Sequence, residues 1–190
     1  MAKTGERKAQ ILQTLAAMLE NPKGERITTA LLAARLEVSE AALYRHFVSK
    51  AQMFEGLIEF IEQTVFGLVN KIQAEEPDGA KQIEATVATL LGFAQKNPGM
   101  TRVLIGDALV NEDERLQTRV NQLVDRLEAS LRQSARLAVT AGALPADWDV
   151  NAYANAIIAF VVGRWHQFAK SGFKRAPMEG WPQQWRVFAA

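Results

Sequence analysis

The sequence predicts an all-helical protein of eight or nine helices, and three observations lead to this fold class. Apolar residues recur every three or four positions along almost all of the 190-residue chain, whereas the alternation typical of strands is nearly absent. Proline, glycine and asparagine divide this pattern into segments. With 48% hydrophobic residues, the chain can bury a substantial core. Its longest apolar run, 156–162, is far shorter than the roughly 20 residues that cross a bilayer.

Three short helices are expected in the first fifty residues. Apolar positions at helical spacing over 11–19 predict the first, which ends at Asn21-Pro22. The second covers 30–36 and follows a pair of threonines suited to an N-cap. The third is capped by Ser39 and runs to about Phe47.

The remaining residues predict longer helices. Ser49 and Gln52 have the spacing of a capping box and open a fourth helix that continues to the break at 77–79, with Leu68 on its inner face. A fifth helix ends at Asn97-Pro98, where asparagine suits the N-cap of the next. The seventh begins on heptad spacing, but Ser130 and Ser134 interrupt the seam, which favours a core-facing helix over a true coiled coil. The last four helices are expected at about 99–110, 112–139, 150–170 and 181–188.

The residue inventory excludes most chemistry. Without cysteine there is no disulfide and no thiolate metal site, and His46 and His166 are too far apart in the sequence to suggest a metal site. Phosphate-binding and nucleophile motifs are absent as well. We therefore expect neither an enzyme nor a cofactor. Because the N-terminus is polar and charged, it does not predict a signal peptide, and we expect a cytoplasmic protein that requires no membrane.

Charge is distributed unevenly along the chain. Residues 1–50 carry eight Lys/Arg against five Asp/Glu, a net charge of +3, whereas residues 51–190 carry fourteen against sixteen, a net charge of −2. A polyanion should therefore meet the N-terminal end first.

Two short helices separated by about three residues, the second with an exposed polar face, are typical of a helix-turn-helix. We expect the threonines before the first helix, the tyrosine and the lysine that opens the fourth helix to bind phosphates: Thr28, Thr29, Tyr44 and Lys50. The second helix presents the candidate recognition residues Ser39, Glu40, Ala42, Tyr44, Arg45 and His46. Tyr44 and His46 could equally be half-buried packing residues, and Arg45 a solvated cation.

The stretch ITTALLAARLEVSEAALYRHFVSKAQMF resembles the DNA-binding domain of TetR-type regulators. The resemblance implies a three-helix DNA-binding domain over 1–50, followed over 51–190 by a helical domain for dimerisation and partner binding. One position departs from the family: Glu37 occupies the turn where glycine is usual, and a non-glycine residue held left-handed costs about 1–2 kcal/mol.

Further stretches, SKAQMFEGLIEFIE, LLGFAQKNPGMTRVLIGDAL and RLQTRVNQL, are similar to the nucleoid occlusion branch of that family. This resemblance implies a nucleoid-associated homodimer that binds palindromic double-stranded DNA and then engages the division protein FtsZ. It also implies a groove between the fourth and fifth helices for the acidic and hydrophobic FtsZ tail, at Phe60, Gly92, Lys96 and Asn97. Core packing for Phe60 and N-capping for Asn97 remain alternatives. Leu68 stands where the branch often has a basic residue.

The eighth helix is the candidate dimer interface, since it is apolar around most of its circumference and must be covered on two sides. One side can meet its own core and the other a twin chain, with Gly163 allowing close crossing. The expected interface residues are Ile157, Ile158, Val161, Val162 and Trp165.

Two other functions stay open. A transcriptional repressor released by a small apolar ligand would need a pocket between the fourth and seventh helices, lined by residues such as Phe66, Phe93 and Met100. The other open function is a binding module that does not bind DNA. The basic N-terminus argues against it.

Overall fold

A computed structural model gives the fold of residues 4–21 and 27–189; Lys3, Lys23 and Arg26, which contribute to the N-terminal positive charge, lie outside these described residues. Nine α-helices and one 3-10 helix make up the described ranges, which contain no strand, and this confirms the predicted class. Their bounds are α1 (Thr4–Leu19), α2 (Thr29–Arg35), α3 (Glu40–Tyr44), α4 (Lys50–Glu75), α5 (Gly79–Lys96), α6 (Pro98–Leu104), η1 (Asp107–Leu109), α7 (Glu114–Thr140), α8 (Val150–Lys170) and α9 (Trp181–Phe188). None of them is long and apolar enough to pass through a bilayer.

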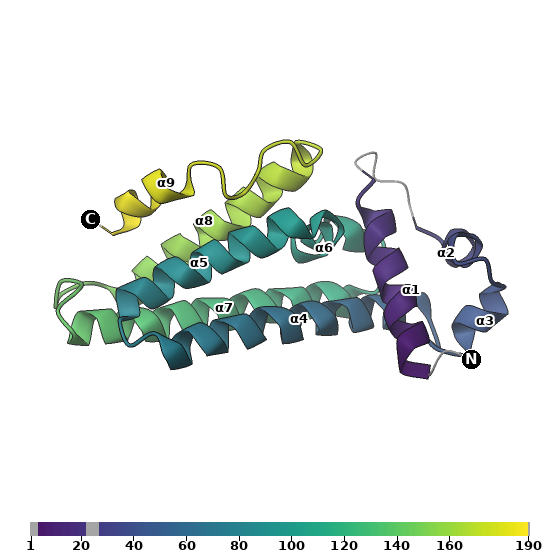
Figure 1. The fold of residues 1–190 in the computed structure, drawn as a ribbon, viewed down its shortest axis with the longest axis horizontal. Coiled ribbons are helices and arrows are strands. Elements are labelled where there is room, and N and C mark those ends of the chain that lie inside the picture. The colour runs from purple at the N-terminus through teal and green to yellow at the C-terminus, as the bar shows by residue number, and fades with distance from the viewer. Residues whose placement is uncertain (1–3, 22–26, 190) are drawn as a thin grey trace.

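The helices form a head and an elongated body (Figure 1). The head consists of α1, α2 and α3, which gather at one end of the molecule, while α4, α5, α7 and α8 run lengthwise through the body. α4 joins the two, since it packs on α1 as well as on α5 and α7. α9 lies beside α8, where the Tyr153 hydroxyl donates to the Phe188 carbonyl oxygen at 2.8 Å.

The core of the body contains apolar side chains from all four long helices, among them Ile61, Leu90, Leu127 and Val161, each essentially inaccessible to solvent. Trp165 is buried as well, and its indole Nε1 donates to the Leu90 carbonyl oxygen at 3.2 Å, which satisfies the polar atom that burial brings with it.

Polar side chains join α4, α5 and α7 at the end of the body remote from the head. The Ser134 hydroxyl donates to Gln82 Oε1 at 2.7 Å, and Gln82 Nε2 donates to the Glu76 carbonyl oxygen at 2.7 Å. Gly79 lets α5 start directly against α7, because a Cβ at this position would lie 2.3 Å from the Ser134 carbonyl oxygen. These contacts fix the lengthwise position of α5 relative to α7.

The head meets the body where α6 begins against α1. A Cβ on Gly99 would lie 2.0 Å from the Ala16 carbonyl oxygen, so only glycine fits this contact without a shift. Arg102 Nη1 donates to the carbonyl oxygens of Leu19 at 3.3 Å and Asn21 at 3.2 Å, which accounts for acceptors at the end of α1.

Arg102 also connects this joint to α8. Its Nε lies 2.7 Å from Asp107 Oδ2, and Lys170 of α8 pairs with the other oxygen of the same carboxylate. Partial burial alone would raise the pKa of Asp107, but the hydrogen bonds from Lys170 and Arg102 outweigh it and hold that pKa below its ordinary value.

The local capping predictions are confirmed in part. Ser49 accepts from the Gln52 backbone N–H at 3.1 Å, although Gln52 Oε1 accepts from Val48 N–H and not from Ser49. Glu37 is left-handed with φ 55°, as the turn requires. Asn97 occupies the N-cap position of α6 as predicted, but its side-chain amide donates to the Phe93 carbonyl oxygen at 2.7 Å and makes no cap hydrogen bond.

Three other expectations are also corrected. α3 ends at Tyr44 and not near Phe47, because the chain turns there towards the Ser49 cap. The sixth helix ends at Leu104, before Gly106 with φ 76°, and η1 follows. Leu68, expected on the inner face of α4, is 43% exposed.

The contact between Gly99 and α1 predicts that glycine-to-alanine substitutions at Gly99 and at the exposed Gly67 have opposite effects on stability. Gly99→Ala should destabilise the protein by about 1–3 kcal/mol because the new methyl group meets the α1 backbone. Gly67→Ala lies on the exposed side of α4, where the new Cβ would meet no other part of the described chain within 4 Å apart from its own helix, and it should stabilise the protein by up to about 1 kcal/mol. Chemical denaturation of both variants measures this, and equal stability of the two would contradict the tight contact.

Candidate nucleic-acid interface and partner groove

The helix-turn-helix predicted from the sequence is formed by α2 and α3. Leu32, Leu43 and Phe47 are buried beneath it and fix the two helices on the head. The Thr28 hydroxyl caps α2 by accepting from Leu31 N–H at 3.1 Å, and the Ser39 hydroxyl caps α3 by accepting from Ala42 N–H at 3.3 Å. The side chains of both caps remain exposed.

Thr29 and Glu40 join the two helices directly. The Thr29 hydroxyl donates to Glu40 Oε2 at 2.6 Å across the turn, so these two predicted DNA contacts also hold α2 and α3 in register. A carboxylate at the first turn of α3 is favourable there because the helix N-terminus carries partial positive charge.

The remaining candidates on α3 differ in exposure. Tyr44 is 46% exposed, and Arg45 is exposed without an ion-pair partner in the described residues. Ala42 and His46 are half-buried, and His46 Nδ1 is buried with no hydrogen-bond partner among the residues that the structure describes. Val48, which sequence reasoning did not select, is 81% exposed just after α3; its position next to the Ser49 cap is the signal that could have identified it.

Lys50, which we expected to bind phosphate, is engaged in an ion pair within the protein. Its ammonium group pairs with Glu112, which precedes α7, and the two side chains are only 21% and 12% exposed. The predicted phosphate contact therefore competes with an ion pair inside the protein.

A groove of about 700 Å³ separates the head from the body. It lies between α1 and α4, with the start of α6 at one end, and Phe60 and Asn97 both line it. Phe60 is 48% exposed, so the core-packing alternative for it is wrong. Other lining residues are Lys8, Leu12, Glu55, Glu59, Met100 and Arg119.

The charges in this groove are mixed. Arg119 Nη2 lies 2.7 Å from Glu62 Oε2, and this hydrogen bond raises the pKa of the arginine. Lys8 lies over the ring of Phe47 at 5.5 Å. Glu55 and Glu59 leave the α4 wall of the groove acidic.

Gly92 and Lys96 lie one turn apart on α5 and are not part of the groove lining. Space is open above Gly92, and Lys96 is exposed without an ion-pair partner in the described residues. The structure therefore brings Phe60 and Asn97 together in the hollow and leaves Gly92 and Lys96 on the neighbouring surface of α5.

The structure corrects the expected dimer interface on α8. Four of its five residues are buried inside their own chain, Val161 at 0% exposure and Trp165 at 1%, because α5 and α7 pack against that side. The buried four are Ile157, Ile158, Val161 and Trp165; Val162 is half-buried.

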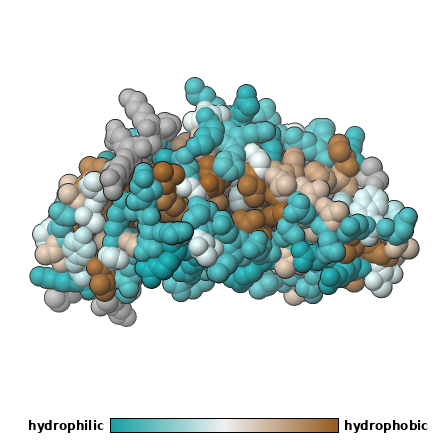
Figure 2. Space-filling view, turned by 180° about the vertical axis from the view of Figure 1, so that it is seen from behind, coloured by the Kyte–Doolittle hydropathy of each residue, from teal (hydrophilic) through white to brown (hydrophobic). Residues whose placement is uncertain are grey.

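The opposite side of α8 is open to solvent. It carries small side chains one or two turns apart, Ala152, Ala156 and Ala159, followed by Gly163 with open space beside it. In Figure 2, apolar surface crosses the middle of the face on which α8 lies, between hydrophilic margins.

Comparison with known proteins agrees with this geometry. Residues 23–57 match the family described as bacterial regulatory proteins, tetR family, and residues 78–190 match the SlmA-like tetracyclin repressor C-terminal domain. The nucleoid occlusion factors SlmA of Marinomonas sp. and Alteromonas mediterranea are 51% and 50% identical, covering 98% of this chain and 95% of theirs. The chain belongs to the SlmA family of TetR-type regulators.

Solved structures support the same fold. A TetR transcription regulator from Haloarcula marismortui has a TM-score of 0.80 at 15% identity and covers 97% of each chain. PfmR from Thermus thermophilus has a TM-score of 0.78 at 21% identity and covers 94% of this chain and 96% of its own. As a member of the SlmA family, the chain is a DNA-binding regulator and not an enzyme. This excludes the alternative that it is a binding module that does not bind DNA.

The interface predicts different roles for two basic residues. Arg45→Ala should weaken duplex binding and flatten the dependence of log affinity on log salt by about 1, because one phosphate contact is lost. Lys50→Ala should change that slope less and lower the melting temperature more, because it leaves Glu112 unpaired. Anisotropy titrations over a salt series, with thermal melts, measure both; equal slope changes would return Lys50 to the phosphate contacts.

Proposed function

We propose that the protein is a nucleoid occlusion factor, which binds palindromic chromosomal sites and, when bound, opposes FtsZ assembly over the nucleoid. The observation that carries this proposal is identity of about half the sequence, over nearly the whole chain, with SlmA relatives. In this proposal residues 1–50 bind DNA, residues 51–190 dimerise and hold the partner, and the protein is cytoplasmic and associated with the nucleoid.

The DNA-binding part of the proposal uses the exposed surface of α3. Tyr44 and Arg45 extend into solvent, and Thr28 and Ser39 keep exposed hydroxyls at the two helix N-termini, where phosphate binding is favourable. A twofold dimer would present two such helices about 34 Å apart, which matches one turn of B-DNA.

The dimer part of the proposal uses the outer side of α8. Because Ala152, Ala156, Ala159 and Gly163 have small side chains, two copies of α8 can approach closely there. A second chain would also cover the apolar surface of this face.

The proposed dimer surface can be tested by introducing one charged side chain on the outer side of α8. Ala159→Glu should give folded monomers, because glutamate suits a helix but would be buried unpaired in the interface. Asn70→Glu, on the exposed side of α4, is the matched control and should stay dimeric. Sedimentation measures the mass of each, and an unchanged mass for Ala159→Glu would exclude this side of α8.

The FtsZ part of the proposal uses the groove and the end of α5. Phe60 offers a large exposed ring and Gly92 leaves space above the helix. Lys96 is exposed, has no ion-pair partner within 4–21 and 27–189, and can pair with a carboxylate. Asn97 bonds to Phe93 and contributes to the wall of the groove.

Two pairs of variants test this partner site. Lys96→Glu should abolish binding of an FtsZ-tail peptide through repulsion, whereas Lys81→Glu at the other end of α5 should not. Phe60→Ala should weaken binding by about 2 kcal/mol, whereas Leu68→Ala, also exposed on α4, should have little effect. Peptide titrations measure the loss, and operator binding and melting should stay unchanged in all four variants.

The ligand-released repressor is the second candidate, but no observation favours it. Phe66 and Phe93, expected to line its pocket, are buried in the core, and Met100 lines the open groove. If the wild-type protein does not bind the FtsZ tail, this repressor becomes the better account.

A further inference from the structure

Glu40 places an exposed carboxylate on the helix-turn-helix. It is the first residue of α3, and within 4–21 and 27–189 it has no ion-pair partner. DNA is a polyanion, so a carboxylate brought close to it is repelled unless a hydrogen-bond donor of the DNA reaches that carboxylate. Glu40 is therefore compatible with tight DNA binding when it accepts a hydrogen bond from the DNA itself.

A hydrogen bond from Thr29 fixes the direction of this carboxylate. The Thr29 hydroxyl donates to Glu40 Oε2 at 2.6 Å, from the first residue of α2 to the first residue of α3. In the part of the chain that the structure describes, Oε1 receives no hydrogen bond. Because Thr29 restricts the rotamers of Glu40, less side-chain entropy is lost when Oε1 binds a donor. The pair presents one fixed, charged acceptor at the start of α3.

The start of the second helix is the part of a helix-turn-helix that reaches the bases. That helix lies in the major groove with its N-terminal residues at the base edges, while the first helix crosses the backbone. Leu43 and Phe47 are buried and anchor α3 to the head, whereas Glu40 and Ala41 are exposed. Ala41 adds only a methyl group beside Glu40, so a base edge can approach the carboxylate. Glu40 is therefore placed to contact a base and Thr29 to lie nearer the backbone.

The base that suits a carboxylate follows from the major-groove edges. Guanine presents two acceptors, N7 and O6, and thymine presents the O4 acceptor and a methyl group. Adenine presents its N6 amino group next to the N7 acceptor, which repels a carboxylate. Cytosine presents the N4 amino group and no acceptor of its own, and glutamate accepts from this group. The chemistry of Glu40 therefore selects cytosine.

We propose that Glu40 determines one base of each half-site, because its Oε1 accepts from the N4 amino group of a cytosine while Thr29 positions the carboxylate through Oε2. This inference rests on the proposed function and deepens its DNA-binding part. It differs from the phosphate contact expected of Arg45, which carries no sequence information. Repulsion of bases that present an acceptor adds to the specificity that the attraction gives.

The test measures base preference with the full-length protein. Wild type and variants select from a pool of duplexes with a randomised centre, and anisotropy titrations then use single-base-pair variants of the selected site. Wild type should select cytosine at one position of each half-site and lose about tenfold or more in affinity when thymine replaces it. Glu40→Ala should bind all four base pairs at this position within about twofold. Glu40→Gln should select adenine there, because an amide pairs with both N7 and N6.

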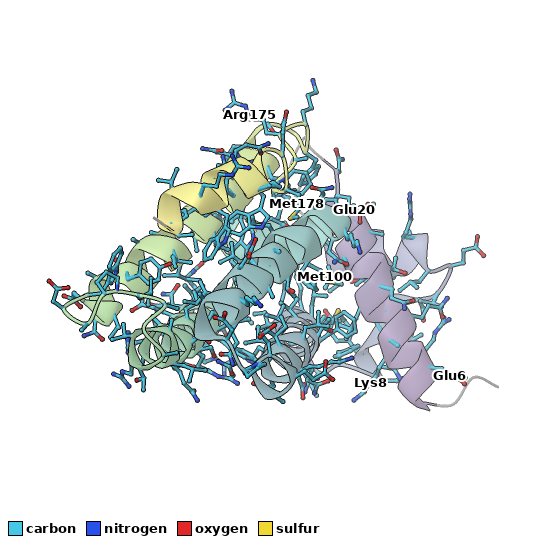
Figure 3. All side chains as sticks on the ribbon, turned by 60° about the vertical axis from the view of Figure 1, so that its left-hand side comes forward. Glu6, Lys8, Glu20, Met100, Arg175 and Met178 are labelled. Atoms are coloured by element: carbon cyan, nitrogen blue, oxygen red, sulfur yellow. The ribbon has the colours of Figure 1, made fainter. Side chains whose placement is uncertain are left out.

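Further variants separate base reading from charge. Glu37→Gln, in the turn, and Glu20→Gln, at the opposite end of α1 from Lys8 (Figure 3), each remove one exposed carboxylate from the head. Both should keep the wild-type preference at every position. Thr29→Val removes the donor to Oε2 and should lower the preference for cytosine over thymine about threefold or more. Thr29→Ser keeps the hydroxyl and should restore that preference.

Thermal melts of the same variants distinguish base reading from a structural role. If Glu40→Ala melts at a lower temperature and binds every duplex more weakly, but selects the wild-type site, Glu40 only joins α2 to α3 and the inference is wrong. If the position that responds to Glu40 is not cytosine in the wild-type site, the base assignment is wrong. A palindromic site in which no position responds to Glu40 excludes the inference while the proposed function stands. If wild type selects no palindromic site, the proposed function fails and the inference fails with it.

Discussion

The close contact between Gly99 and the backbone of α1 determines how the head sits on the body. Because the α6 backbone reaches the Ala16 carbonyl oxygen without a side chain between them, Arg102 can reach the end of α1 and Asp107 together. Asp107 also pairs with Lys170, so a short chain of charged groups connects α1 to α8. The orientation of the recognition helix relative to the outer side of α8 depends on this joint.

The groove shares its walls between the two parts that this joint connects. α1 supplies Lys8 and Leu12, α4 supplies Phe60, and Asn97 immediately precedes the residues that contact α1. A peptide in the groove would contact head and body simultaneously, so its affinity would depend on their spacing. By linkage, DNA that changes this spacing and peptide that requires it would change each other's affinity by the same factor.

Sequence reasoning succeeded where the decisive contacts are local and failed where they are distant. The caps at Thr28, Ser39 and Ser49 involve neighbours three residues away, and the bounds of α8 follow from its own pattern. The pairing of Lys50 with Glu112 joins residues 62 positions apart, which no local pattern contains. An apolar pattern also cannot assign the sides of α8, because Val161 would be equally apolar against its own core or against a second chain.

The hydrogen bonds among Ser134, Gln82 and Glu76 have a mechanical consequence for the body. Apolar side chains can slide past one another and find equivalent neighbours, but a hydrogen bond weakens steeply when its atoms shift or tilt. These bonds and the Gly79 contact lie at the end of the body remote from the head. They therefore fix the position of α5 relative to α7 at that end. A rotation of α5 about this end would therefore displace α5 most at its other end, near the head.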